Sequence, residues 1–312
     1  MNRLIHSPSG SLRHIQMSHV SLWIFVEGFE DRSFFSAICN RCSCLEGVKY
    51  RLVLSQEVSG MPGRGKDVLV RRFRLMRKRR QLVTDLCGKR SVVLFFVDKD
   101  IDDQVGRLMQ SDHLVYSEFY SVENYWFRYG NIVNAMAIGG GIEHKAAETV
   151  VSATAGAWLR RAAEAWQTWV EFCLFIHRNG IRGQATYRVC SQFHDVAFPY
   201  SLGCAAKRAS LYAQVSLDCG MSRDALLRKR SIAGRVVREL FSANRFDSVF
   251  AGSWYVHFLV ADVKTAAAGG ELRQKSLHQC LTSALQATVD FSGDWTGRYI
   301  AAIERAVRKL VP

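Results

Sequence analysis

Two short apolar runs in this chain break abruptly into carboxylates. Leu22–Val26 is followed by Glu27, and Val92–Val97 is followed by Asp98 and Asp100. Runs of this length, rich in Val, Ile and Phe, predict strands buried on both faces of a parallel sheet, and such sheets place their chemistry at the carboxyl ends of the strands. If the two strands are neighbours, the three carboxylates converge, and oxygen ligands of this kind are those that Mg²⁺ prefers. The pattern therefore predicts a metal site suited to phosphoryl transfer.

The remaining pattern predicts how the chain is organised. Helical periodicity over 31–42 and 68–87 alternates with strand-like runs over 48–54 and 114–120, which implies a parallel sheet with helical crossovers. From about Asn131, Ala-rich and Trp-containing stretches favour helix. We therefore expect an α/β fold with three parts: a flexible leader over 1–19, an α/β catalytic domain over 20–130 and a mainly helical domain over 131–312.

The spacing of the second acidic motif suits metal binding. Asp98 and Asp100 are two residues apart, so on a strand they point to the same face while Lys99 points to the other. A solvated loop after the strand is the alternative for this motif alone. Glu27, at the end of another buried strand, shifts the balance to a metal site, and Asp102 and Asp103 extend the acidic cluster.

Composition indicates an ordered globular protein with a polyanionic partner. The chain has 312 residues, of which 48% are hydrophobic, and a net charge of +14. Half of this excess lies in Arg71–Arg80, where seven residues are cationic and none is anionic. Without Glu partners one helical turn away, such a helix gains from contact with nucleic acid, although an acidic protein partner or a solvated face remains open. The candidate nucleic-acid-binding residues are Arg64, Lys66, Arg71, Arg72, Arg74, Arg77, Lys78, Arg79 and Arg80.

Cysteine usage and hydropathy favour a reducing, cytoplasmic environment. The nine cysteines lack the spacing of a disulfide scaffold, and no apolar run is long enough for a membrane span. Cys39, Cys42 and Cys44 could suggest zinc, but no fourth ligand is evident. Buried small hydrophobes are the better interpretation of these three residues.

The glycine-rich segment Gly60–Lys66 matches the first seven positions of a phosphate-binding P-loop. The eighth position should be Ser or Thr to reach Mg²⁺, and here it is Asp67. Because a carboxylate there would repel nucleotide phosphates, we prefer a loop that brings Lys66 and Arg64 towards a nucleic-acid phosphate. An NTPase built on this loop is the alternative.

Four ordered motifs together resemble the Toprim domain of OLD-like nucleases, and more narrowly the Toprim effectors of PARIS anti-phage defence systems. The motifs lie within residues 20–130, and a weaker match is Gly252-Ser-Trp-Tyr-Val-His257. Arg64 precedes Gly65 where the family has a second glycine. The four motifs are Phe25-Val-Glu27-Gly28-x-x-Asp31-x-x-Phe34-Phe35, Gly65-Lys66-Asp67-Val68, Phe96-Val97-Asp98-Lys99-Asp100-Ile101-Asp102 and Tyr120-Ser-Val-Glu123-Asn124-Tyr125.

This resemblance implies a nuclease that depends on Mg²⁺ or Mn²⁺. In such systems the effector is held inactive by an ABC-type ATPase, and the released effector, expected to act as a homodimer, cleaves transfer RNA and halts translation. A DNA nuclease of the OLD type and a non-catalytic binding subunit remain alternatives. The residues expected to be catalytic are Glu27, Asp98, Asp100 and Lys66; those expected to bind metal are Glu27, Asp98 and Asp100, with Asp102 and Glu123 as further candidates.

Overall fold

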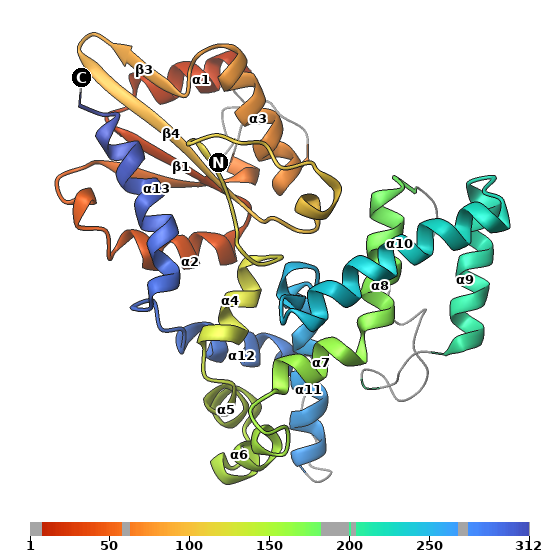
Figure 1. Cartoon of the computed structure of the whole chain (residues 1–312). Helices are drawn as coiled ribbons and strands as arrows, with labels where there is room; N and C mark the ends of the chain where they lie inside the picture. Colours follow the sequence, from red (N-terminus) through yellow and green to blue (C-terminus); the bar gives the residue numbers. More distant parts are fainter. Residues whose placement is uncertain (1–7, 58–62, 182–199, 201–203, 268–273, 312) are drawn as a thin grey trace. The chain divides into compact units, whose positions relative to one another are not determined.

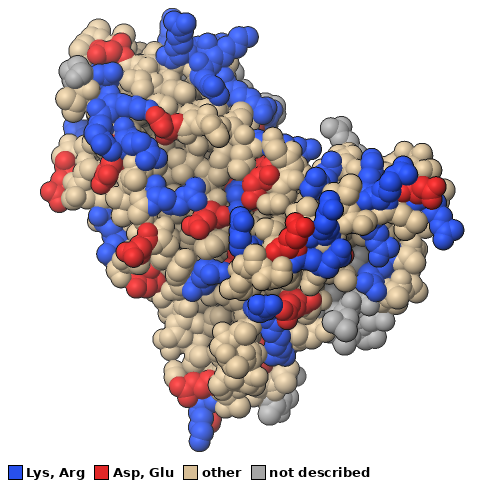
Figure 2. Space-filling view, in the orientation of Figure 1, with Lys and Arg blue, Asp and Glu red and all other residues tan. Residues whose placement is uncertain are grey.

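The computed structural model describes residues 8–57, 63–181, 200, 204–267 and 274–311, which form two compact units (Figure 1). The sheet unit comprises Met1–Lys99, Leu108–Ser117 and Asp290–Pro312, and the helical unit comprises Asp100–Arg107 and Glu118–Val289. Lys and Arg side chains are distributed over the surfaces of both units (Figure 2). The units do not follow the predicted boundary at residue 130, because the last residues of the chain group with the sheet.

The sheet unit contains a five-stranded, mostly parallel sheet, which confirms the predicted α/β fold class. Its order is β2-β1-β4, and β3 and β5 both pair with the other edge of β4. Leu22 of β1 pairs with Val92 of β4, so the two strands that are followed by carboxylates are neighbours, which is the condition that the predicted metal site requires. The strands are β1 (Leu22–Val26), β2 (Tyr50–Leu54), β3 (Val83–Leu86), β4 (Lys89–Val97) and β5 (Leu114–Tyr116).

Helix α3 (Lys66–Lys78) is shorter than the predicted helix over 68–87. It ends where Arg80 takes a left-handed conformation (φ 55°) and the N–H of Gln81 donates to Met76 O at 2.8 Å. The chain then forms β3, which runs antiparallel to β4. Cys87 and Gly88, both with positive φ, form the two-residue turn between these strands. The prediction was wrong here because Cys-Gly lacks the usual Asn or Asp turn signal.

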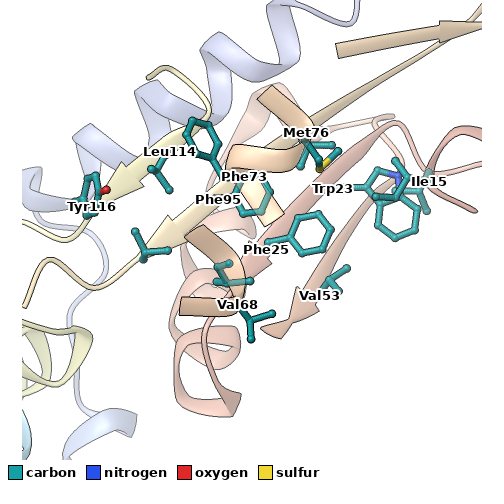
Figure 3. Packing of buried hydrophobic residues seen from close by; sticks show 14 residues of the cluster. Ile15, Trp23, Phe25, Val53, Val68, Phe73, Met76, Phe95, Leu114 and Tyr116 are labelled. Atoms are coloured by element: carbon teal, nitrogen blue, oxygen red, sulfur yellow. The ribbon is translucent and has the colours of Figure 1, made fainter. Parts of the chain in front are cut away.

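One face of the sheet packs against α1 (Pro8–Met17) and α3. Side chains that alternate along the strands, such as Trp23, Phe25 and Phe95, point into this layer (Figure 3). Ile15 of α1 is only 4% exposed and belongs to the same core. The expectation of a flexible leader over 1–19 is therefore corrected for residues 8–17, which are helical and carry a core side chain.

The opposite face packs against α2 (Phe29–Cys39) and the C-terminal helix α13 (Gly297–Arg308). The Phe35 ring stacks on Phe96 of β4 with centroids 4.2 Å apart, and Tyr299 of α13 contacts both rings edge-on. Aromatic pairs in these geometries add to the stabilisation from apolar burial. Helix α13 thus completes the core of the sheet unit, although its sequence predicted only membership of a helical domain.

The second unit is helical, as predicted for most of residues 131–312. In the described part of the chain, no helix has both the length and the apolar character needed to cross a membrane. Its α-helices are α4 (Val122–Tyr129), α5 (Ile132–Asn134), α6 (His144–Ser152), α7 (Trp158–Ala165), α8 (Gln167–Arg178), α9 (Ala205–Asp218), α10 (Arg223–Ser242), α11 (Gly252–Ala266) and α12 (Gln274–Ala287).

Both units also contain short turns of other helix types. In the sheet unit, 3₁₀ turns cover Ser43–Leu45, Ser55–Glu57 and Asp294–Thr296. In the helical unit, 3₁₀ turns cover Asp102–Val105 and Phe246–Ser248, and a π-turn covers Ala135–Gly139.

The surroundings of His113 in the sheet unit lead us to expect a lower free energy of unfolding in acid. Its Nδ1 lies 2.7 Å from Val93 O and its Nε2 lies 3.1 Å from Lys309 Nζ, so the neutral ring donates to the carbonyl and accepts from the ammonium group. Burial lowers the pKa of His113, and so does Lys309, whereas the Val93 bond and Asp112 act the other way. The pKa of His113 in the folded protein is therefore below the unfolded value of about 6.5. The contribution of the neutral ring to the free energy of unfolding is present above pH 6.5 and is lost as the pH falls.

We therefore expect the free energy of unfolding to fall between pH 7.5 and 5.5, and to fall less in His113→Gln. Urea denaturation at both pH values measures this difference. His19→Gln, which changes an exposed histidine, is the matched control and should retain the full pH dependence. Equal pH dependence in His113→Gln and the unmodified protein would contradict the assignment.

Candidate functional site

All four parallel strands of the sheet end in a polar residue. Ser55 follows β2, Glu27 follows β1, Asp98 follows β4 and Ser117 follows β5. Val26 lies beside Leu54 and Val97 lies beside Tyr116, whereas Phe25 of β1 pairs with Phe95 of β4, so Asp98 and Ser117 follow one position beyond Glu27 and Ser55 along the same carboxyl edge. This edge is where open parallel sheets bind their ligands.

Glu27 is held in place by contacts from three chain segments. Its Oε1 accepts the N–H of Asp98 at 2.8 Å, which joins the ends of β1 and β4. Its backbone oxygen accepts a hydrogen bond from Ser55 Oγ at 2.6 Å, and the same Oγ accepts the N–H of Gly65 at 2.8 Å. A Cβ placed on Gly65 would lie 3.8 Å from Glu27 Oε2, so the glycine loop passes directly beside this carboxylate.

Ser55 and Ser117 are functional candidates that sequence analysis missed. Ser55 links β1, β2 and the glycine loop, and Ser117 Oγ accepts the N–H of Lys99 at 2.8 Å. Both are buried, at 2% and 3% exposed. The signal was present for Ser55, which directly follows the strand predicted over 48–54. Ser117 lay inside the strand predicted over 114–120 and follows a strand only because β5 ends at Tyr116.

Lys66 brings a positive charge to the same edge. It is the first residue of α3, and Gly65 before it has a φ of 71°, a conformation that favours glycine. Lys66 Nζ donates to Lys99 O at 3.0 Å and lies 5.7 Å from the centre of the Tyr116 ring. The structure thus places Lys66 at the carboxyl edge, while the predicted contact of Lys66 and Arg64 with a nucleic-acid phosphate stays a prediction.

The structure describes only part of the segment that resembles a P-loop, since Gly60, Met61 and Pro62 lie outside the described residues. Asp67, at the position that Mg²⁺ binding would require to be Ser or Thr, is exposed in the first turn of α3. An acidic residue there interacts favourably with the helix dipole. Asp67 thus has a structural explanation that does not involve a nucleotide.

The geometric argument for Asp98 and Asp100 was wrong, because neither lies on a strand. Strand β4 ends at Val97, and Asp100 has a left-handed φ of 52°. The alternation of side chains across a strand therefore does not apply. Lys99 is the buried member of the three at 7% exposed, while both aspartates are half-buried.

Three of the predicted ligands, Asp100, Asp102 and Glu123, belong to the helical unit. There, the N–H of Asp100 donates to Tyr120 O at 2.7 Å, and the N–H of Tyr120 donates to Asp247 O at 2.7 Å. Asp102 Oδ1 lies 3.4 Å from His177 Nε2. The backbone of Asp100 is thus tied through one residue to Asp247.

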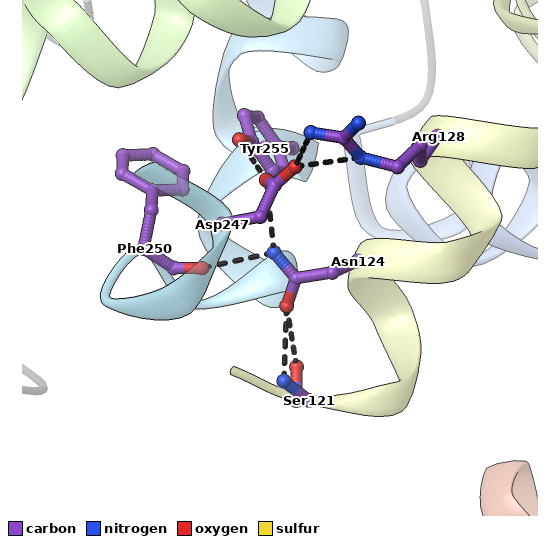
Figure 4. A network of polar contacts seen from close by, with 6 residues as sticks. All are labelled: Ser121, Asn124, Arg128, Asp247, Phe250 and Tyr255. Carbon is purple, nitrogen blue, oxygen red and sulfur yellow. Dashed lines mark hydrogen bonds and ion pairs between the residues drawn. The ribbon is translucent and has the colours of Figure 1, made fainter. Parts of the chain in front are cut away.

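Asp247 is the centre of a buried polar network in the helical unit (Figure 4). Its carboxylate accepts from Arg128 Nε at 2.9 Å and Nη2 at 2.5 Å, from Tyr255 Oη at 2.6 Å and from Asn124 Nδ2 at 3.2 Å. Asn124 Oδ1 in turn accepts from the N–H and hydroxyl of Ser121. Burial, and then Asp247, raise the pKa of Tyr255. Through these bonds, Asp247 joins α4, which carries Asn124 and Arg128, to α11, which carries Tyr255.

The weak match at Gly252 has a packing explanation in this network. Gly252, the first residue of α11, lies so close to α4 that a Cβ on it would be 2.3 Å from Asn124 N. Only glycine fits at such a contact. Two of the motifs that carry the family resemblance therefore pack against each other.

The basic helix α3 presents a cationic face, with one exception. Arg71, Arg74, Arg77 and Lys78 are exposed, and so are Arg64, Arg79 and Arg80, which lie outside the helix. Arg72 is fully buried beside Phe73 and Met76, and burial followed by the charge of Arg79 lowers its pKa to about 10. Its predicted role as a surface contact for nucleic acid is therefore corrected, because it lies on the core-facing side of the helix.

The carboxyl edge fits the donor chemistry of Mg²⁺. Glu27 and Asp98 lie together in the sheet unit, and Mg²⁺ is commonly bound through one or two carboxylates with its remaining positions taken by water and substrate phosphate. Within the described ranges, no three His, Cys, Asp or Glu side chains are grouped as a complete metal-binding set. Burial raises the pKa of Cys39 and of Cys42 to about 12, which opposes the thiolate form that zinc requires.

No protein-family model matches the chain, and no curated protein matches its sequence. The resemblance to Toprim nucleases therefore rests on the four motifs themselves. For the parts of the motifs that lie in the sheet unit, the fold adds an arrangement: a glutamate and an aspartate follow adjacent parallel strands, and Lys66 at the start of α3 donates to Lys99 O.

Proposed function

We propose that this chain is a metal-dependent endonuclease of the Toprim type. The observation that carries the proposal is the 2.8 Å bond from the Asp98 N–H to Glu27 Oε1, which fixes the Glu27 carboxylate beside the backbone of Asp98 at the ends of two adjacent strands. Lys66, donating to Lys99 O, supplies a cation beside them. Carboxylates and a lysine at this edge of a parallel sheet suit the transfer of a phosphoryl group.

In the proposed mechanism, Glu27 and Asp98 would hold Mg²⁺, with Asp100 two residues further along the chain. When bound, the ion would supply Lewis acidity for phosphoryl transfer. Glu27, oriented by the Asp98 N–H, also accepts a proton from the attacking water. Lys66 offsets negative charge that develops on the phosphoryl oxygens. Ser55 positions both groups, because it joins Glu27 to the loop that precedes Lys66.

The family resemblance extends the proposal to a biological role. The enzyme would act in the cytoplasm as the toxic effector of an anti-phage defence system, with transfer RNA as its substrate and arrest of translation as the outcome. An ABC-type ATPase would hold it inactive, and a homodimer would be the active form. The net charge of +14 and the exposed cations of α3 support a polyanionic substrate.

Incubation of the purified protein with transfer RNA, single-stranded DNA and duplex DNA tests the proposal. We expect cleavage of RNA with Mg²⁺ or Mn²⁺ and none with EDTA. Sequencing of the RNA termini then identifies the cleavage site. Cleavage of DNA alone would indicate an OLD-type nuclease. Nucleic-acid association without cleavage, unchanged by EDTA, would support the second candidate, a binding subunit, which the exposed basic face of α3 favours.

A further inference from the structure

Helix α10 of the helical unit is a second strongly basic helix. Between Arg223 and Ser242 it contains six cationic residues and only two acidic ones, Asp224 and Glu239. Lys and Arg side chains gather over this helix in the space-filling view (Figure 2). The cations of α10 are spread over 16 positions rather than clustered in ten, so they give a weaker local signal in the sequence than the cations of α3.

Half of these cations make no ion pair with the residues that the structure describes, although Asp224 lies one turn before Arg228 and Glu239 lies one turn after Arg235. Arg238 is paired with Glu171 at 3.5 Å, and the Arg230 guanidinium lies 4.3 Å from the centre of the Tyr212 ring. Arg223 lies in the first turn, beside Asp224 in sequence. Arg228, Lys229 and Arg235 are all exposed, and no ion pair joins them to any residue that the structure describes. We call these three residues the α10 basic face.

The geometry of the helix places Arg228 and Arg235 on one stripe. They are seven residues apart, which is two helical turns and about 10 Å along the axis. Ser231, also exposed, lies one turn from each and offers a hydroxyl group between them. Ala233, Val237 and Phe241 are buried on the other side of the helix. The basic stripe therefore faces away from the core.

We propose that the α10 basic face binds the phosphate backbone of a nucleic acid. Guanidinium groups donate in a planar fork that matches phosphate oxygens, and a row of cations spaced along a helix suits the repeated charges of one strand. The six cations of α10 outnumber its two carboxylates, so the exposed cations repel one another, and a polyanion relieves that repulsion. This binding surface is separate from α3 and requires no cleavage activity.

The test is fluorescence anisotropy of a labelled RNA hairpin with the full chain in EDTA, between 50 and 300 mM salt. The triple variant Arg228→Gln, Lys229→Gln, Arg235→Gln should bind roughly 10- to 100-fold more weakly at 100 mM salt. The magnitude of the slope of log K against log salt should fall by about 2. A matched variant that removes three exposed cations elsewhere, Arg41→Gln, Lys49→Gln, Lys145→Gln, should change both quantities much less.

Two further measurements make the result decisive. The double variant Arg228→Lys, Arg235→Lys keeps the positive charges and should retain most of the affinity for RNA. Retained affinity would show that the loss in the triple variant comes from the missing charge and not from misfolding. A labelled acidic peptide tests the rival partner. An unchanged affinity and slope in the triple variant, an equal loss in the matched variant, or a loss for the peptide but not for RNA would each overturn the proposal. Failure of the nuclease assay would leave this outcome unaffected, because binding is measured without metal.

Discussion

Replacing Glu27 with Gln is expected to lower the rate of metal-dependent cleavage by roughly 10²- to 10⁴-fold, the range typical for loss of an acid–base or charge-stabilising group. The substitution keeps an oxygen that can accept the Asp98 N–H, so the contact between β1 and β4 should persist. It removes the negative charge that would hold the metal. Glu27→Ala should be equally inactive but less stable, because it leaves the Asp98 N–H without this acceptor.

The control for this prediction is Glu30→Gln. Glu30 is exposed in the first turn of α2, three residues after Glu27, and its substitution makes the same chemical change away from the strand end. It should leave the cleavage rate within about twofold, as is usual for a surface change. Initial rates on transfer RNA with Mg²⁺, together with circular dichroism, measure both effects. Full activity in purified Glu27→Gln would refute the role assigned to this residue.

Asp247→Ala is expected to destabilise the helical unit by about 2–4 kcal/mol, since it leaves buried donors without their acceptor and Arg128, whose side chain is 30% exposed, without its counter-ion. The Asp247 carboxylate is 2% exposed and accepts from Arg128, Tyr255 and Asn124. Tyr255 is fully buried, so its hydroxyl cannot replace this bond with one to bulk water. The loss should therefore exceed that of an ordinary surface ion pair.

Tryptophan fluorescence during urea denaturation measures this loss, because five of the seven tryptophans lie in the helical unit. Asp224→Ala, a change of the same type at an exposed site in the first turn of α10, should cost at most about 1 kcal/mol. A loss below 1 kcal/mol in Asp247→Ala would show that the network does not stabilise the unit.

The carboxyl edge could be predicted from sequence because its signals are local and strong. Leu22–Val26 and Val92–Val97 are buried on both faces, so every position is apolar and the first charged residue marks the end of the strand. Parallel pairing then brings Glu27 and Asp98 to the same edge without any knowledge of side-chain contacts. The helical character of the second unit was predictable for a similar reason, namely long stretches that favour helix.

The features that were missed depend on contacts distant in sequence or on unusual backbone conformations. Helix α13 packs on the sheet through Tyr299, which no local pattern reveals. The β3–β4 turn depends on a cysteine with positive φ, and Asp100 leaves the strand geometry through a conformation that few non-glycine residues adopt. The burial of Arg72 was hidden because a basic cluster was expected to face solvent throughout.

The order of synthesis gives the position of α13 a further consequence. The helical unit, Glu118–Val289, is almost entirely an insertion within the sheet unit, and Asp290–Pro312 leaves the ribosome only after it. Until then, Phe35 and Phe96 lack their contact with Tyr299, and α2 covers this face of the sheet without α13. The carboxylate edge is therefore assembled on a complete core only after the helical unit and α13 have been synthesised. An enzyme proposed to cut transfer RNA would thus stay immature until that point of its synthesis.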